Sequence, residues 1–332
     1  MSRPSPSAIL TSQGGRLIST RPRAGSLLLP SVLAAVVLAS TACGSSVGDP
    51  ESARCNAPRT TFGPKLSLVD HAEVAVRFRC VGAVLAGTLF LPKGAGPFPA
   101  VVYVHGSGEA ARWRWEVPWV QMVVRAGIAF FSYDKRGVGE SQGVCCPGDQ
   151  SHFNLLAADA DGAVNAVRKR VEIDAPRIGF LGTSQAGWVV PLAIVRARNR
   201  VAFTALADSP AVTTDEEAQW SKLAGEDASN PPPLTSQERA VLTRKLHPSG
   251  FDPVPFLEQV TVPGIWVYGR LDRSQPAEKS AATLERLHSS KGKDFTVVLF
   301  GHAEHGLLDT PPSDPRAMPT LLAWIRKHVR TS

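Results

Sequence analysis

The sequence predicts an α/β protein with a mostly parallel central sheet, helices on both faces and a short helical insertion. From about residue 65, short apolar runs alternate with longer segments of helical periodicity, an order typical of parallel strands joined by helices. The run "AVVYV" at 100–104 is apolar throughout, as in a strand covered on both faces. With 332 residues, 43% of them hydrophobic, the chain is long enough to bury such a core.

The expected elements follow in order along the chain. Residues 74–78 and 84–91 have the pattern of two hairpin arms. Further strands are expected at 100–104, 128–133, 178–181, 201–207, 264–268 and 295–300. Helices are expected at 117–126, 155–170, 186–198, 277–287 and 319–329. Reactive groups of parallel sheets gather at the carboxyl ends of strands, so the residues that follow each strand are the candidates for a site.

The first 42 residues have the composition of a targeting segment. They hold four arginines (Arg3, Arg16, Arg21 and Arg23), no acid, and an apolar stretch at 27–38 that is shorter than the roughly 20 residues of a membrane span. Small residues then precede Cys43, which resembles the lipid-modified cysteine of a bacterial lipobox, although Ser40 stands where that motif has Leu. We expect a signal peptide at 1–42 and a linker at 43–64. Lipidation of Cys43 and ordinary cleavage near Ala42 stay open, and both predict an exported protein, attached to the cell envelope or secreted.

The charge and the cysteines limit the partners. Without the four N-terminal arginines the formal net charge falls from +7 to +3, which is too small and scattered to predict a nucleic-acid partner. Export places the cysteines where disulfides persist. Cys55 with Cys80 is the simplest pair, which leaves Cys145 and Cys146 as a vicinal pair or free thiols; buried free thiols are the alternative. No Cys/His spacing matches a zinc site, so we expect neither metal nor cofactor.

Between residues 209 and 260 the regular alternation stops. Thr214 with Glu217, and Thr235 with Glu238, have the spacing of a helix capping box. The stiff segment "SNPPPL" at 229–234 separates them. We therefore expect two short helices that form a mobile lid over the site.

Polar residues follow five of the expected strands. "HGSG" at 105–108 follows the first of them, "DKRGVGES" at 134–141 the next, and "GTSQAG" at 182–187 the third. Asp272 comes shortly after the strand at 264–268, and His305 after the strand at 295–300. A serine, an acid and a histidine thus occur at strand ends in the order Ser184, Asp272, His305.

These residues resemble the α/β-hydrolase superfamily over about 74–329, and within it the branch of exported serine esterases and dienelactone-hydrolase-like enzymes. Gly182–Ala186 resembles the G-x-S-x-G nucleophile elbow, with Ala186 in place of the second glycine. His105–Gly106 is similar to the oxyanion-hole turn of that fold, and 134–141 to its D-x-R-G-x-G-x-S loop. The resemblance implies an α/β-hydrolase fold, a serine nucleophile and an acyl-enzyme. A methyl group at Ala186 should be tolerated where the helix crosses the elbow.

The residue types suit this chemistry. The Ser184 hydroxyl needs a base to remove its proton, and a neutral His305 is suited to that role near neutral pH. Asp272 would hold His305 in the correct tautomer, while the amides of Gln185 and Ser107 would bind the developing oxyanion. Asp208, which also ends a strand, is the competing acid, but its place before Ser209-Pro210 favours a hinge or capping role at the entrance to the lid.

Other residues are assigned structural roles. His302 is expected to be a loop residue. Arg136 and Glu140 are expected to brace the 134–141 loop, with binding of a substrate carboxylate as the alternative. Four tryptophans are expected to pack near the mouth of the site, or to line an acyl pocket: Trp113, Trp115, Trp119 and Trp188.

The predicted function is that of an exported serine hydrolase acting on a small-molecule carboxylic ester or thioester. The enzymatic alternative is a serine peptidase of the prolyl-oligopeptidase type, although the stretch before residue 100 is too short for the propeller of those enzymes. The alternative from another class is a noncatalytic binding protein of the cell envelope with a hydrolase fold. The presence of all three triad residues favours the enzyme.

Overall fold

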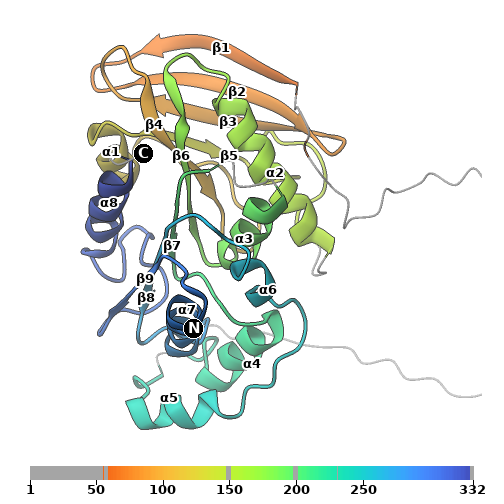
Figure 1. Cartoon of the computed structure of the whole chain (residues 1–332), viewed down its shortest axis with the longest axis vertical. Coiled ribbons are helices and arrows are strands. Elements are labelled where there is room, and N and C mark those ends of the chain that lie inside the picture. The colour runs from red at the N-terminus through yellow and green to blue at the C-terminus, as the bar shows by residue number, and fades with distance from the viewer. Residues whose placement is uncertain (1–54, 56–58, 147–150, 197–200, 230, 330–332) are drawn as a thin grey trace, which may run out of the picture. The chain divides into compact units, whose positions relative to one another are not determined.

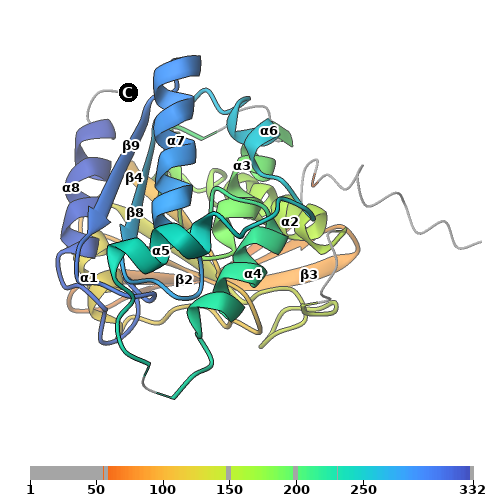
Figure 2. The ribbon, with the colours of Figure 1, turned by 90° about the horizontal axis from the view of Figure 1, so that it is seen from below.

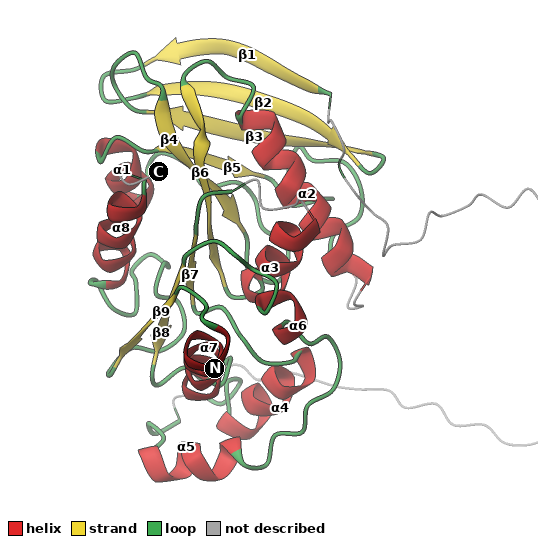
Figure 3. Cartoon of the chain, in the orientation of Figure 1, coloured by secondary structure: helices red, strands yellow, loops and turns green. Residues whose placement is uncertain are grey.

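The computed structural model describes residue 55 and residues 59–146, 151–196, 201–229 and 231–329. The expected signal peptide and Cys43 lie outside this part of the chain. The described strands, drawn in yellow in Figure 3, are β1 (Thr60–Ser67), β2 (Ala72–Cys80), β3 (Ala83–Leu91), β4 (Phe98–Val104), β5 (Ala129–Tyr133), β6 (Ile173–Thr183), β7 (Thr204–Ala207), β8 (Gly264–Gly269) and β9 (Phe295–Phe300). The helices are α1 (Pro118–Arg125), α2 (Ser151–Val167), α3 (Ala186–Arg196), α4 (Thr214–Ala224), α5 (Ser236–Thr243), α6 (Val254–Leu257), α7 (Ala277–Lys291) and α8 (Ala317–His328).

The nine strands form one sheet in the order β1-β2-β3-β5-β4-β6-β7-β8-β9 (Figure 1). β1, β2 and β3 are antiparallel to their neighbours, whereas the pairs from β5 through β4 to β9 are parallel. The register brings the carboxyl ends together: Val104 lies opposite Gly182, and Thr183 opposite Ala207. The predicted mostly parallel sheet is therefore confirmed, and the residues that follow β4, β6 and β7 meet at one edge.

Helices cover both faces of the sheet, as the sequence predicts. Buried residues of α2, α3 and α7 pack with β2 and β4 in one apolar cluster. Buried residues of α1 and α8 pack on the other face against β5, β7 and β8. In Figure 1 the sheet separates α1 and α8 from α2 and α3. The central strands are covered on both sides, which explains the apolar runs in their sequences, such as 100–104 in β4 and 178–181 in β6.

The N-terminal edge strand β1 differs from the prediction. It begins at Thr60, inside the range expected to be a linker. Most of its residues are exposed or half-buried, and its pairing with β2 shifts between Phe62 and Lys65, around Gly63-Pro64. A strand of this kind has no apolar alternation to reveal it.

Every helix in the described ranges is too short or too polar to cross a membrane.

The insertion between β7 and β8 contains α4, α5 and α6. Figure 2 shows α4 and α5 side by side next to α7. Thr235 caps α5 with Glu238 as predicted, but the capping box of α4 is Thr213 with Glu216, one residue before the predicted pair. The sequence allows either Thr213 or Thr214 to cap the helix. In the structure the hydroxyl of Thr214 instead accepts a hydrogen bond from the Phe251 amide at 3.0 Å.

Candidate active site

Ser184 stands on a sharp turn between β6 and α3. Its φ is +50°, a left-handed conformation that is rare for a residue with a side chain. The turn is closed by hydrogen bonds from the Ser184 amide to the Ala207 carbonyl (3.1 Å) and from the Gly187 amide to the Ser184 carbonyl (2.9 Å). A Cβ atom at Gly182 would lie 2.6 Å from the Cβ atom of Ala186. The methyl group of Ala186 is therefore accommodated because residue 182 has none.

The turn after β4 lies against this elbow. A Cβ atom at Gly106 would lie 3.2 Å from the Cβ atom of Ser184, so glycine allows the backbone to come this close. Among the described residues, no backbone acceptor takes the amide proton of Ser107 or of Gln185. Both amides are therefore free to bind a ligand atom. The structure thus brings the two predicted oxyanion donors to the elements that surround Ser184.

His105 is a structural residue of this turn. It is 5% exposed, and its Nε2 donates a hydrogen bond to the Tyr133 carbonyl at 2.6 Å. Burial lowers the pKa of His105 to about 4, so the ring is neutral at physiological pH. Because its Nε2 carries the proton that bonds to β5, His105 holds the turn at a defined distance from that strand.

His305 and Asp272 form a hydrogen-bonded pair. His305 lies in the loop after β9, and its Nδ1 is 2.8 Å from Oδ2 of Asp272. Asp272 is 1% exposed, and its Oδ1 accepts the amides of Ser274 (2.8 Å) and Gln275 (3.0 Å). These amides fix the carboxylate, so Nδ1 carries the proton of a neutral His305 and Nε2 is left with its lone pair. The predicted pairing of Asp272 with His305 is present in the structure.

The acids around His305 favour its charged form. Burial alone would lower the pKa of His305, but the Asp272 carboxylate outweighs it and, with Asp208 and Glu226, raises the pKa to about 9. His302 is exposed, as expected of a loop residue.

Asp208 has a different role from the predicted one. It is buried, has a φ of +47°, and bonds to the histidine loop: Oδ2 accepts the amides of Gly306 (3.0 Å) and Leu307 (2.7 Å). Oδ1 accepts the Gly269 amide at 3.3 Å. The prediction of a hinge or cap at the lid was wrong, because the carboxylate points to a loop nearly 100 residues further along the chain, which no local pattern reveals.

Asp208, Asp272 and His305 offer ligand atoms that lie within 4.8 Å of one another. This is the spacing of a metal site, but each carboxylate oxygen already accepts at least one N–H bond. These bonds hold both carboxylates against the segments around His305.

Helix α4 of the insertion is attached to the Asp272 loop. The indole Nε1 of Trp220 donates to the Asp272 carbonyl at 3.1 Å, and the Arg273 guanidinium donates to the carbonyls of Ala224 and Pro232. Glu217 lies close enough to His305 and Asp272 to interact with them electrostatically. Burial, together with the charge of Glu226, raises the pKa of Glu217 to about 7. A cavity of about 540 Å³ is lined by α4 and the turn after it, including Glu217 and Glu226.

The remaining predicted residues are mostly structural. Arg136 is buried and binds Asp159 through both Nε (3.0 Å) and Nη2 (2.5 Å), while Glu140 pairs with Arg77 and Arg112. Both therefore brace the loop, and the alternative of a carboxylate-binding Arg136 is not supported by its position.

The tryptophans do not form one cluster. Trp113 and Trp119 pack around Tyr103, and Trp115 stacks on His71 at 3.6 Å between ring centroids. Trp188 packs in the apolar cluster of the opposite sheet face. The three tryptophans at 113–119 thus pack on the sheet face that carries α1 and α8, whereas Trp188, in α3, packs on the other face.

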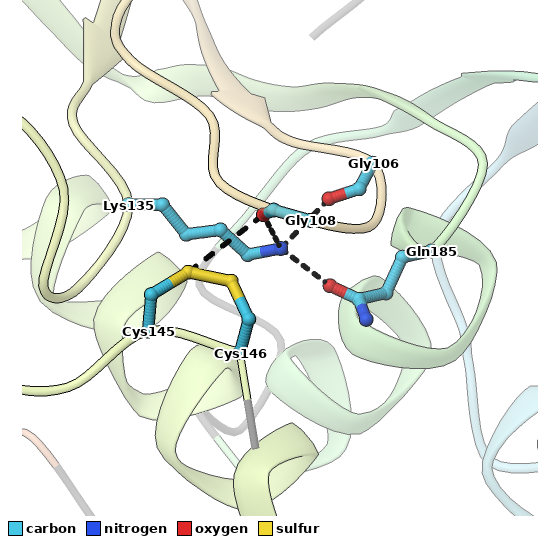
Figure 4. The surroundings of a disulfide bond; sticks show 6 residues. All are labelled: Gly106, Gly108, Lys135, Cys145, Cys146 and Gln185. Carbon is cyan, nitrogen blue, oxygen red and sulfur yellow. Dashed lines mark hydrogen bonds between the residues drawn. A yellow bond between two sulfur atoms is a disulfide. The ribbon is translucent and has the colours of Figure 1, made fainter. Parts of the chain in front are cut away.

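The cysteines are also arranged differently from the simplest prediction. Cys145 and Cys146 form a vicinal disulfide, whereas Cys55 and Cys80 are free and buried. The two free thiols both lie close to Gly162. A Cβ atom added at Gly162 would be 2.8 Å from Cys55 Sγ and 3.3 Å from Cys80 Sγ. The disulfide lies beside the oxyanion turn, with Cys145 Sγ 3.8 Å from the Gly108 carbonyl oxygen (Figure 4).

The sheet, its strand order and the serine elbow define an α/β hydrolase. The chain has the α/β-hydrolase fold, and residues 95–248 match the family described as "Serine aminopeptidase, S33". The matched part contains β4, the elbow and α4, but ends before Asp272 and His305.

Solved structures with the same fold include esterases and a peptidase. Acetyl xylan esterase 1 from Thermoanaerobacterium sp. JW/SL YS485 is 18% identical, with a TM-score of 0.58 over 82% of this chain and 88% of that one. The acylaminoacyl peptidase of Pyrococcus horikoshii is 14% identical, with a TM-score of 0.55, and the match covers 81% of this chain but 41% of the peptidase. The uncharacterized protein YfhR of Salmonella typhi is 31% identical over 102 residues, which is 30% of this chain and 32% of that protein. These likenesses establish the fold.

Proposed function

We propose that this protein is a serine hydrolase that cleaves carboxylic esters and thioesters through an acyl-enzyme on Ser184. The observation that carries the proposal is the left-handed backbone of Ser184 at the end of β6. A strained residue at a strand end, with a glycine turn against it and two free amides beside it, is an arrangement that exposes a nucleophile.

The proposed reaction has two halves. In the first, Ser184 Oγ attacks the carbonyl carbon while Nε2 of His305 takes the hydroxyl proton, and the oxyanion accepts hydrogen bonds from the Ser107 and Gln185 amides. The proton then passes to the leaving alcohol or thiol as its bond to the carbonyl carbon breaks. In the second half, His305 takes a proton from water as the water oxygen attacks the acyl carbon. It returns that proton to Ser184 Oγ as the bond between Oγ and the acyl carbon breaks and the acid is released. Asp272 stabilises the imidazolium in both halves.

Labelling by an active-site phosphonate tests the proposal directly. We expect one covalent adduct on Ser184, identified by peptide mass spectrometry, and none in Ser184→Ala. On a panel of p-nitrophenyl esters, Ser184→Ala and His305→Ala should lose nearly all turnover, while His302→Ala, the matched control in the same loop, should keep most of it. Ester hydrolysis by Ser184→Ala at the wild-type rate would refute the proposal.

A peptidase is the second candidate, because the matching family is described by an aminopeptidase activity. Aminoacyl p-nitroanilides belong in the same panel. A higher kcat/KM for these amides than for any ester would favour the peptidase. Absence of turnover on every substrate, together with absence of phosphonate labelling, would instead favour a noncatalytic binding protein.

A further inference from the structure

Lys135 is a buried lysine with no role in the reaction described above. It follows β5 by two residues and is 3% exposed. Its ammonium donates three hydrogen bonds: to the carbonyls of Gly106 (2.8 Å) and Gly108 (3.0 Å), and to Oε1 of Gln185 (2.8 Å). Figure 4 shows these bonds radiating from one nitrogen atom. Every proton of the ammonium is therefore used.

The partners of Lys135 are the two sides of the expected oxyanion hole. Gly106 and Gly108 flank Ser107 in the turn after β4, and Gln185 supplies the other amide from the elbow. The Gly106 carbonyl and the Ser107 amide belong to one planar trans peptide unit, in which C=O and N–H point in opposite directions. A bond that draws the Gly106 oxygen toward Lys135 therefore turns the Ser107 N–H away from Lys135.

The lysine is itself held in place. Its amide donates to the Ala110 carbonyl at 3.0 Å, and its carbonyl accepts the Val138 amide at 2.9 Å. All three acceptors of the ammonium are uncharged, so they do not neutralise it. Burial of a charge without a carboxylate partner is unfavourable, and here it lowers the pKa of Lys135 to about 8. A methionine of similar length would avoid this cost, but it would leave the three acceptor oxygens without their donor.

We propose that Lys135 is a positioning residue that joins the Gly106–Gly108 turn to Gln185 and thereby holds the Ser107 and Gln185 amides in the geometry of an oxyanion hole. The inference rests on the proposed serine hydrolase function. Lys135 touches neither substrate nor Ser184 in this scheme; it acts through the peptide groups that it binds.

Lys135→Met tests the proposal, with Lys93→Met, at an exposed lysine, as the matched control. Loss of one oxyanion donor costs about 10²–10³-fold in kcat, so we expect Lys135→Met to lower kcat by about 10²-fold while KM changes less than about threefold. The rate of phosphonate labelling should fall by a similar factor, because the phosphonyl oxygen occupies the same hole. Because the change removes a buried charge but also leaves three acceptors without this donor, the melting temperature should differ from that of the wild type by no more than a few degrees.

A double-mutant cycle with Gln185→Met separates this role from general packing. Gln185→Met removes one of the three bonds and should lower kcat by about tenfold, but it should have little further effect in Lys135→Met, because both changes break the same connection. If Lys135→Met does not fold, the kcat and KM of Gln185→Met alone carry the test.

The outcomes are distinguishable. Phosphonate labelling of Lys135→Met at the wild-type rate, an unchanged kcat, or strictly additive effects in the cycle would overturn the role of Lys135. Failure of the wild-type protein to label at Ser184 would instead refute the proposed hydrolase function.

Discussion

Replacing Asp272 by Asn should impair catalysis far more than replacing Asp208 by Asn, although both acids lie near His305. In Asp272→Asn the carbonyl oxygen can keep the amides of Ser274 and Gln275, which places the new NH₂ group opposite Nδ1 of His305. Two donors cannot face each other, so His305 moves its proton to Nε2, the atom that must act as the base. We expect kcat to fall by up to about 10⁴-fold.

Asp208→Asn meets a different set of partners. All three are backbone amides, and the two shorter bonds, from Gly306 and Leu307, go to one oxygen. The asparagine can keep these two and lose the 3.3 Å bond to Gly269, which leaves one buried donor unpaired at a cost of about 1–3 kcal/mol. We expect melting to drop by a few degrees and kcat to fall by no more than about tenfold.

Steady-state kcat on one p-nitrophenyl ester, with thermal melts of the same preparations, decides between the acids. The reasoning is refuted if Asp208→Asn loses as much kcat as Asp272→Asn while it still melts near the wild-type temperature. That result would make Asp208 the acid that orients the histidine. Asp208→Ala serves as the structural control: it removes all three acceptors and should destabilise the protein more than Asp208→Asn does.

Three further predictions concern pH, substrate and location. Because neighbouring acids raise the pKa of His305 to about 9 and its neutral form is the base, kcat/KM should rise with pH up to about 9. Glu226→Gln should move the midpoint of this rise in kcat/KM to lower pH, whereas Glu285→Gln, at an exposed site on α7, should not. An unchanged pH profile for Glu226→Gln would contradict the assignment of the rise to His305. Within the described residues of the insertion, only Leu223 and Val241 are exposed large apolar residues, with exposed fractions of 42% and 37%. We therefore expect p-nitrophenyl acetate and butyrate to be better substrates than the decanoate. Activity that appears only above the micellar concentration of the ester would contradict this prediction. If Cys43 is lipidated, Cys43→Ser should move the protein from the membrane pellet to the soluble fraction in a bacterial host, and an unchanged distribution would exclude the lipid anchor.

The sequence predicted the parts of this protein that local patterns determine. The central segments 100–104 of β4 and 178–181 of β6 are buried because both faces are covered, and glycines near their ends mark the turns at Gly106 and Gly182. The order of the strand ends then led to Ser184, Asp272 and His305. The pairing of Asp272 with His305 is present, since β8 and β9 are adjacent and parallel.

Other contacts depended on tertiary packing. The hydrogen bonds of Lys135 and Asp208 link segments that are between 27 and 99 residues apart. Both residues follow strands that the sequence marks, but no local pattern names their distant partners. The capping box of α4 was misplaced by one residue because consecutive threonines precede two glutamates. Strand β1 was missed because its side chains are mostly exposed.

The end of β7 connects the serine to the histidine loop. The carbonyl of Ala207 accepts the amide of Ser184, and the next residue, Asp208, accepts the amides that follow His305. The amide of Asp208 in turn bonds to Val267 in β8, the strand that leads to Asp272. Two consecutive residues, Ala207 and Asp208, therefore link the turn that carries Ser184 to the loop that carries His305, and Asp208 has a positive φ of +47° at this junction. For this reason Asp208→Asn, which retains the side-chain shape, is expected to spare the geometry that Asp208→Ala disturbs.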